Sequence, residues 1–186
     1  MGSAKASPNV DNYYVGKGIL YIADFPGAGA PSWIDLGNCP RLEYEPTEQV
    51  IEHYSSRNKA REQDDETVIM SGYNLSFILD EISVKNMQLF MRASKVGTNI
   101  LRANQSLAQR YALKFVSDNV RGPDIKFEFW KVKLTPNGSF SVLGDDYGTL
   151  SFNGKGLSDS ANHSTSPFFT ATFVTTTTSS TTTTTA

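Results

Sequence analysis

The stretch from Val68 to Arg92 constrains the fold most, because its hydrophobic residues change from the spacing of a strand to that of a helix. Between Tyr73 and Leu79 every second residue is large and apolar, and the residues between them are polar, apart from Ile78. This alternation predicts a strand with one face on a core. The predicted inward residues are Tyr73, Leu75, Phe77 and Leu79.

From Val84 onward the apolar residues follow a helical spacing instead. Val84, Met87, Phe90 and Met91 fall on one side of a helix with 3.6 residues per turn. Ser83 directly precedes them and suits an N-cap, whose side chain accepts a hydrogen bond from an amide of the first turn. The sequence therefore predicts a strand that leads into one short helix, with Met87 and Phe90 packed on a sheet.

The length and composition predict one folded domain. A chain of 186 residues can bury roughly 70% of its unfolded surface without disulfides. We expect a small, polar N-terminal arm at residues 1–12 and a folded domain at residues 13–175. Residues 176–186 are almost wholly Thr and Ser, and we expect them to be flexible because they lack the apolar side chains that would offset ordering entropy.

Charge and cysteine content exclude several function classes. The net charge of −2 does not favour duplex DNA binding through phosphate neutralisation. No apolar run approaches the ~20 residues that cross a bilayer, so membrane insertion is not expected. Cys39 is the single cysteine and can form no intrachain disulfide, and no secretory leader is recognisable, which together predict assembly in a reducing cytoplasm.

Alternating segments predict a mainly β protein around this strand and helix. In residues 125–134 the inward positions run through Phe127 and Phe129 and then shift to Trp130, Val132 and Leu134, which indicates a β-bulge. Pro136-Asn137-Gly138 predicts a tight turn that joins this strand to one at 140–143. The other predicted strands are residues 15–23, 33–36, 41–45, 110–116, 147–152 and 168–174, and residues 154–167 are predicted to be loop.

A charged segment, Thr47 to Val68, precedes the organising strand and is predicted to be a long loop. From Glu43 to Glu66 there are eight acidic and three basic residues, a local charge of −5 that leaves +3 for the rest of the chain. Loops of this length are usually functional or disordered, so it is either a solvated, flexible hairpin or an assembly contact. The candidate contact residues are Glu48, Val50, Ile51, Glu52, Tyr54, Arg57, Lys59, Arg61, Asp64 and Asp65.

No catalytic or metal-binding pattern is present in the sequence. His53 and His163 both lie in polar segments without a Cys, Asp or His at metal-ligand spacing. Cys39 precedes a proline rather than a helix start, where a thiolate would be stabilised. The acidic cluster around Asp64 has no EF-hand spacing, which excludes that kind of calcium site. We therefore expect neither enzymatic activity nor a metal or cofactor.

The order of elements and several motifs resemble the major tail tube proteins of long-tailed bacteriophages. The motifs are Tyr14 to Tyr21 (YVGKGILY), Leu36-Gly37-Asn38, Glu52 to Arg57 (EHYSSR), Asp64-Asp65-Glu66 and Leu75 to Asn86 (LSFILDEISVKN). The likeness covers about residues 13–175, and the Thr/Ser-rich end is not part of the pattern.

This resemblance implies a β-sandwich or split barrel with one flanking α-helix. In that family, subunits form hexameric rings that stack into a hollow tube, and one sheet of each subunit joins an inner β-barrel. Genome and tape-measure protein pass through the tube, the DNA without specific binding. The resemblance further implies that residues 47–68 pack on the adjacent ring, that tail terminator and baseplate proteins are partners, and that the protein resides in the virion tail.

Two alternatives remain open at the level of sequence. One is another virion or secretion-tube component on the same fold, such as a tail terminator, a baseplate hub or the tube of a contractile system. The other is a carbohydrate-binding β-sandwich, for which Trp33 and Trp130 are the candidate groove aromatics.

Overall fold

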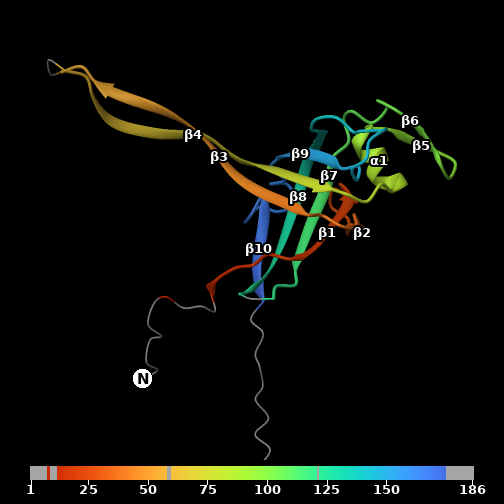
Figure 1. The fold of residues 1–186 in the computed structure, drawn as a ribbon. Helices are drawn as coiled ribbons and strands as arrows, with labels where there is room; N and C mark the ends of the chain where they lie inside the picture. The colour runs from red at the N-terminus through yellow and green to blue at the C-terminus, as the bar shows by residue number, and fades with distance from the viewer. Residues whose placement is uncertain (1–7, 9–11, 58–59, 121, 175–186) are drawn as a thin grey trace, which may run out of the picture.

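The computed structural model describes residues 8, 12–57, 60–120 and 122–174, over which the protein is mainly β with antiparallel strands and one helix, as the sequence predicts (Figure 1). The predicted N-terminal arm falls almost entirely outside the described residues, and the predicted flexible tail at 176–186 falls wholly outside them. The elements are β1 (Gly18–Asp24), β2 (Ile34–Asp35), β3 (Arg41–Ser55), β4 (Glu62–Leu79), α1 (Val84–Phe90), β5 (Ser94–Val96), β6 (Ile100–Arg102), β7 (Tyr111–Ser117), β8 (Asp124–Pro136), β9 (Leu150–Gly156) and β10 (Phe169–Val174).

Eight of these strands form one antiparallel sheet in the order β2-β1-β7-β8-β9-β4-β3, with β10 paired to β8. The long strand β8 divides the sheet, since its first half pairs with β10 at residues 124–129 and its second half with β9 at residues 132–136. Strands β5 and β6 form a separate two-stranded sheet after the helix.

The β-bulge predicted in the 125–134 segment is confirmed. Leu113 pairs with Phe129 and Tyr111 with Val132, so β8 has one residue more than β7 between these pairs. The extra residue turns Val132 and Leu134 toward the core, where both are buried. Trp130 lies at the shift and is only half-buried, which departs from its predicted inward position.

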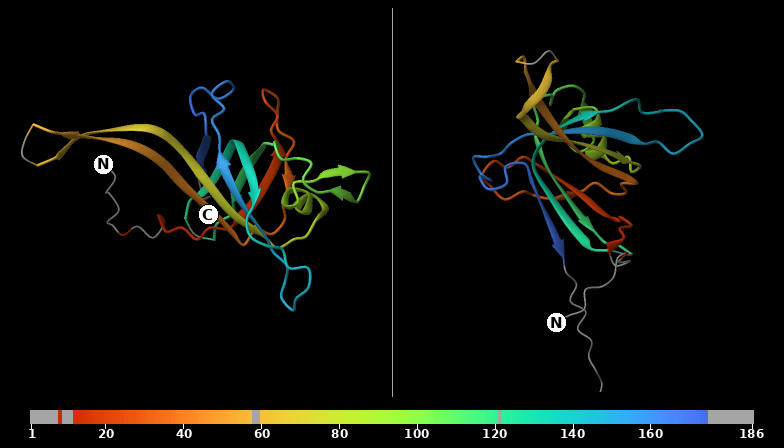
Figure 2. Two further views of the ribbon diagram at one scale, coloured as in Figure 1. Left: turned by 90° about the horizontal axis from the view of Figure 1, so that it is seen from above. Right: turned by 90° about the vertical axis from the view of Figure 1, so that its left-hand side faces the viewer.

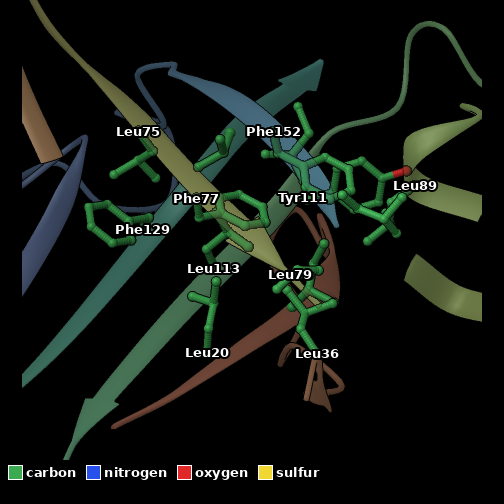
Figure 3. Packing of buried hydrophobic residues seen from close by; sticks show 14 of the residues in the cluster. Leu20, Leu36, Leu75, Phe77, Leu79, Leu89, Tyr111, Leu113, Phe129 and Phe152 are labelled. Atoms are coloured by element: carbon green, nitrogen blue, oxygen red, sulfur yellow. The ribbon is translucent and has the colours of Figure 1, made fainter. Parts of the chain in front are cut away.

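The buried core is built from side chains of β1, β4, β7, β8 and β9 and from Leu89 of the helix, and aromatic residues of β3 and β10 pack at its edge. Tyr44 on β3 lies 5.2 Å from Phe169 on β10 between ring centroids, and Tyr73 on β4 lies 5.4 Å from Phe129 on β8. Figure 3 shows the part of the core around Phe77, where Leu75, Leu113 and Phe152 lie close to its ring. The predicted core residues Tyr73, Leu75, Phe77, Leu79 and Phe129 are buried, and Met87, Phe90 and Phe127 are half-buried against the same cluster.

The helix begins as predicted, although its buried face differs. The Ser83 side chain accepts a hydrogen bond from the Asn86 amide at 3.1 Å, which confirms the N-cap. The buried helical residues are Asn86 and Leu89, and Val84 is exposed. Asn86 tolerates burial because its side-chain Nδ2 donates to the Leu36 and Glu81 carbonyl oxygens.

The strand predicted at 140–143 is absent from the described structure. Strand β8 runs on to Pro136 and pairs with β9, so residues 137–149 form one loop. Strand β9 extends to Gly156, into the segment predicted to be loop. Its glycines fit a strand because added Cβ atoms would collide with Val132 at position 154 and with the Tyr73 ring at position 156.

Candidate functional site: the projecting β3–β4 hairpin

The segment predicted to be a long loop is mostly strand, which corrects that prediction. Residues 47–55 belong to β3 and residues 62–68 to β4, and the two strands pair antiparallel from Arg41–Ile78 out to Ser55–Glu62. Pairing of β4 with β9 ends at Asn74, so beyond that residue β3 and β4 pair only with each other. We call residues 47–57 and 60–72 the projecting hairpin. Figures 1 and 2 show it extending away from the rest of the sheet.

Burial along β4 changes abruptly where the hairpin leaves the body of the protein. Residues 72–79 alternate between half-buried and buried, whereas residues 62–71 are exposed at every position. A loop was predicted here because the segment is rich in charged residues and shows no alternation that would mark a buried face. The ladder between the two strands satisfies the backbone groups without a core, and β-branched residues such as Val50, Ile51 and Val68 favour the extended chain.

Two irregularities shape the projecting hairpin. The pairing shifts between Gln49 and Val50 and again between His53 and Tyr54, so Ile69 and Asp64 are extra residues on β4. Such bulges increase the local twist of a strand pair and turn the side chains that follow. Ile69 belongs to the exposed apolar group described next, and Asp64 to the polar group near the end of the hairpin.

The projecting hairpin exposes large apolar side chains that touch no core. Met70 is 60% exposed and Ile51 57%, and Tyr54, Val68 and Ile69 are also exposed. Val50 is half-buried against its cross-strand partner Val68. Isolated two-stranded hairpins are at best marginally stable in water, and clustered exposed apolar residues mark interaction sites.

Polar side chains near the end of the hairpin bond to one another. His53 Nδ1 lies 2.5 Å from Asp64 Oδ1, and this hydrogen bond raises the pKa of His53 above its usual value. The Tyr54 hydroxyl donates to Glu52, which raises the pKa of Tyr54. The predicted contact residues Glu48, Arg57, Arg61 and Asp65 are exposed, and Lys59 lies outside the described residues. Within the described part of the chain no ion pair joins Arg57 or Arg61 to an acidic side chain.

At the C-terminal end of β4 the structure brings the Leu36-Gly37-Asn38 motif against residues 80–86. We call this group of residues the corner. The amide of Asn38 donates to Glu81 Oε1 at 2.9 Å, and its side chain donates to Asp80 at 2.6 Å. Gly37 has a φ of +79° and lies against the Glu81 carboxylate, where no side chain fits. Asn86 joins the same corner through the Leu36 carbonyl oxygen. The buried role of Asn86 was not predicted from the sequence, where its position three residues after the Ser83 cap was the one available signal.

A family comparison covers both of these features. A model of the family described as protein of unknown function UCP028589 matches residues 13–112, which is more than half of the chain. The chain belongs to this UCP028589 family. The matched range of the UCP028589 domain runs from before β1 into β7 and includes the projecting hairpin, the corner and the helix. No curated protein matches the sequence.

His163 and Cys39, two side chains of types that can act in nucleophilic catalysis, make other contacts in this UCP028589 member. His163 stacks on Trp130 with ring centroids 3.9 Å apart and bonds to Asp159 at 3.0 Å. Burial raises the pKa of Cys39 to about 11, which keeps the thiol protonated. Among the residues that the structure describes, no three His, Cys, Asp or Glu side chains converge as a metal site. No helix in that part of the chain is long and apolar enough to cross a membrane.

The two tryptophans do not line a sugar-sized groove. Lys114 Nζ lies 4.6 Å from the centre of the Trp33 ring, and Trp130 Nε1 donates to the Ser166 carbonyl oxygen. Both line one cavity of about 70 Å³, which is far smaller than the roughly 300–1,000 Å³ typical of ligand pockets. The structure therefore offers no support for the carbohydrate-binding hypothesis at these positions.

Proposed function

We propose that this chain is the structural subunit of a bacteriophage tail tube, in which hexameric rings stack into a hollow tube that conducts genome and tape-measure protein. The projecting hairpin carries this proposal. It exposes Ile51, Ile69 and Met70 on a strand pair that has no third strand and no core beneath it. An element of this kind gains stability when another copy covers it, because burial of apolar surface is favourable.

The open edges of the sheet support assembly into an inner barrel. In the described residues β3 pairs only with β4, and β10 pairs only with β8, so each strand has one free edge. Pro46 fits such an edge because it lacks a backbone donor. We propose that the subunit is a split β-barrel or β-sandwich with one flanking helix, and that free edges of neighbouring subunits align in the ring.

The polar face of the sheet supports a lumen wall. A shallow groove over β3, β4, β9 and β8 is lined mainly by polar residues, Glu43, Glu45, Asn74, Ser76, Thr135, Asn153 and Lys155, together with Tyr44, Leu75 and Gly154. Glu43 accepts hydrogen bonds from Arg41 and Ser76, and these lower the pKa of its carboxyl group and keep it ionised. A face made mainly of small polar groups and fixed charges suits DNA that slides past without specific contacts, because it offers little apolar surface.

The contacts between stacked rings are assigned to the projecting hairpin. Its apolar residues Val50, Ile51 and Tyr54 would cover apolar surface on the next ring. The acidic side chains Glu48, Glu52, Asp64 and Asp65 would face basic groups there, and Arg57, Lys59 and Arg61 acidic ones. In this proposal the protein has no enzymatic activity, cofactor or metal. It is assembled in the host cytoplasm and resides in the virion tail, where tape-measure, terminator and baseplate proteins are its partners.

Negative-stain electron microscopy of the concentrated, purified protein tests the proposal. Hollow tubes with a regular axial repeat are the expected result. Isolated rings that never stack would instead favour a tail terminator or baseplate component on the same fold. Monomers at every concentration would contradict a tube subunit.

A further inference from the structure

The loop between β8 and β9 exposes a second group of large apolar side chains, away from the projecting hairpin. In residues 137–149, Val142 is 81% exposed, Leu143 92% and Tyr147 98%. Phe140 fixes the base of this loop on the helix, with its ring centroid 6.4 Å from that of Phe90. Single exposed apolar residues are ordinary, but three that are almost completely exposed on one anchored loop indicate a contact surface.

The charge of this loop is of one sign. Asp145 and Asp146 lie between Leu143 and Tyr147, and residues 137–149 contain no Lys or Arg. No ion pair within the described part of the chain involves either aspartate. A partner for the loop therefore needs exposed apolar groups next to basic ones.

The β5–β6 hairpin and its flanking residues have that complementary chemistry. Residues 92–110 carry Arg92, Lys95, Arg102 and Arg110 and no acidic residue. Three large apolar side chains on the same segment, Val96, Ile100 and Leu107, are exposed. Within the described residues none of its four basic side chains takes part in an ion pair.

The two surfaces do not satisfy each other within one molecule. The exposures above show that the tip of the β8–β9 loop touches almost nothing in its own chain. In the left view of Figure 2 the β5–β6 hairpin (green) and the β8–β9 loop (cyan) extend in different directions from the helix. Two different, complementary patches on one chain suit a head-to-tail contact between copies.

We propose that the β8–β9 loop of one copy docks on the β5–β6 hairpin of a second copy, with Val142, Leu143 and Tyr147 against Val96, Ile100 and Leu107. Asp145 and Asp146 then lie beside Lys95 and Arg102. This contact is separate from the projecting hairpin, and if the proposed function holds it is a lateral contact in the ring that adds to the alignment of the sheet edges. The projecting hairpin is a poorer occupant of the basic surface because it also carries Arg57 and Arg61.

Cysteine cross-linking tests the contact in the full chain with Cys39→Ser as background. The variant with Val142→Cys and Ile100→Cys should give a ladder of disulfide-linked oligomers on mild oxidation. Each copy can then be linked to one neighbour through position 142 and to another through position 100. The matched control combines Ile100→Cys with Phe173→Cys, whose side chain is also exposed. No ladder above this control would overturn the proposal, as would preferential cross-linking of Ile100→Cys to Met70→Cys.

Charge reversal tests the polar part of the contact. Asp145→Lys with Asp146→Lys should weaken self-association more than about tenfold, and so should Lys95→Glu with Arg102→Glu, because like charges then face each other. All four changes in one chain should restore association, which neither misfolding nor a role elsewhere would produce. Failure to restore it would overturn the proposal. A cross-linked ladder without tubes would support this contact and contradict the tube function. Tubes without a ladder would support the tube function and contradict this contact.

Discussion

The Phe77 ring on β4 stacks on the Phe152 ring on β9, with centroids 5.0 Å apart and planes 17° apart (Figure 3). Both side chains are 1% exposed, and their strands pair directly at these two residues. This contact joins β4, whose first part belongs to the projecting hairpin, to β9 in the main sheet. The position of the hairpin therefore depends on a fully buried aromatic pair.

Replacing Phe77 with alanine should lower the free energy of unfolding by roughly 3–5 kcal/mol, because it removes a buried ring and leaves a cavity. In a domain of this size such a loss should lower the melting temperature by about 10 °C. Thermal or urea unfolding measures it. Phe173→Ala, at a largely exposed position, is the control and should change stability by less than about 0.5 kcal/mol. An unchanged melting temperature for Phe77→Ala would show that this pair does not hold the sheet.

Asn86→Ala should cost roughly 2–4 kcal/mol, although it removes little apolar surface. The Asn86 Nδ2 donates to the Leu36 oxygen at 2.9 Å and to the Glu81 oxygen at 2.8 Å, and both carbonyl groups would lose their donor. Asn74→Ala is the matched control, because the Asn74 side chain makes one long, exposed hydrogen bond. Equal urea midpoints for the two variants would contradict a bracing role for Asn86.

The elements predictable from sequence are those whose signal is local. Alternation marked Tyr73 to Leu79, a serine before an apolar spacing marked the helix start, and a change of phase marked the bulge after Phe129. Each of these depends on side chains within about ten residues of one another. The strand face, the cap and the bulge were accordingly all found where expected.

What sequence reasoning missed depends on partners distant in the chain. Gly154 and Gly156 indicate a loop by composition, yet they lie in β9 because Val132 and Tyr73 occupy the space of their side chains. Asn86 reads as a polar surface residue, yet it is buried because Leu36, fifty residues earlier, supplies a carbonyl acceptor. The projecting hairpin was predicted as a loop because its strands pair with each other alone, so that no buried face imposes an alternation.

The His53–Asp64 pair should make the hairpin sensitive to pH. The hydrogen bond to Asp64 raises the pKa of His53 above 6.5, so the stabilising contribution is complete below that value and is lost as pH rises through the folded-state pKa. Titration of the His53 ring by NMR should show the raised pKa, and Asp64→Asn should return it toward its usual value. Hairpin amides should be better protected from hydrogen exchange near pH 6 than near pH 8, after correction for intrinsic rates.

Glu66→Gln is the matched control for that titration, since Glu66 is another acid of the same strand, accepts a hydrogen bond from Gln63 and is not among the groups that raise the pKa of His53. It should leave the pKa of His53 raised. An unshifted His53 in the unmodified protein, or the same value in Asp64→Asn, would show that the two side chains do not form this pair in solution.

The projecting hairpin should be dispensable for folding and required for assembly. Thr47 and Gly72 are cross-strand partners, so Glu48 to Ser71 can be replaced by an Asn-Gly turn that closes the strands at that pair. None of the described residues in the removed segment is buried, and a shorter connection costs less closure entropy, so the melting temperature should stay within about 3 °C of the original. Electron microscopy and light scattering should then find a folded protein that forms no tubes.

Point variants test the apolar surface of the hairpin without changing the length of the hairpin. Ile51→Ser, Ile69→Ser and Met70→Ser in one chain should raise the concentration needed for polymerisation, because the hairpin then offers less apolar surface to a neighbouring copy. Gln49→Ser with Thr67→Ser, at neighbouring positions of the same two strands, is the control and should polymerise normally. If the shortened protein still forms tubes at the original concentration, or fails to fold, the hairpin is not the element through which copies of this chain stack.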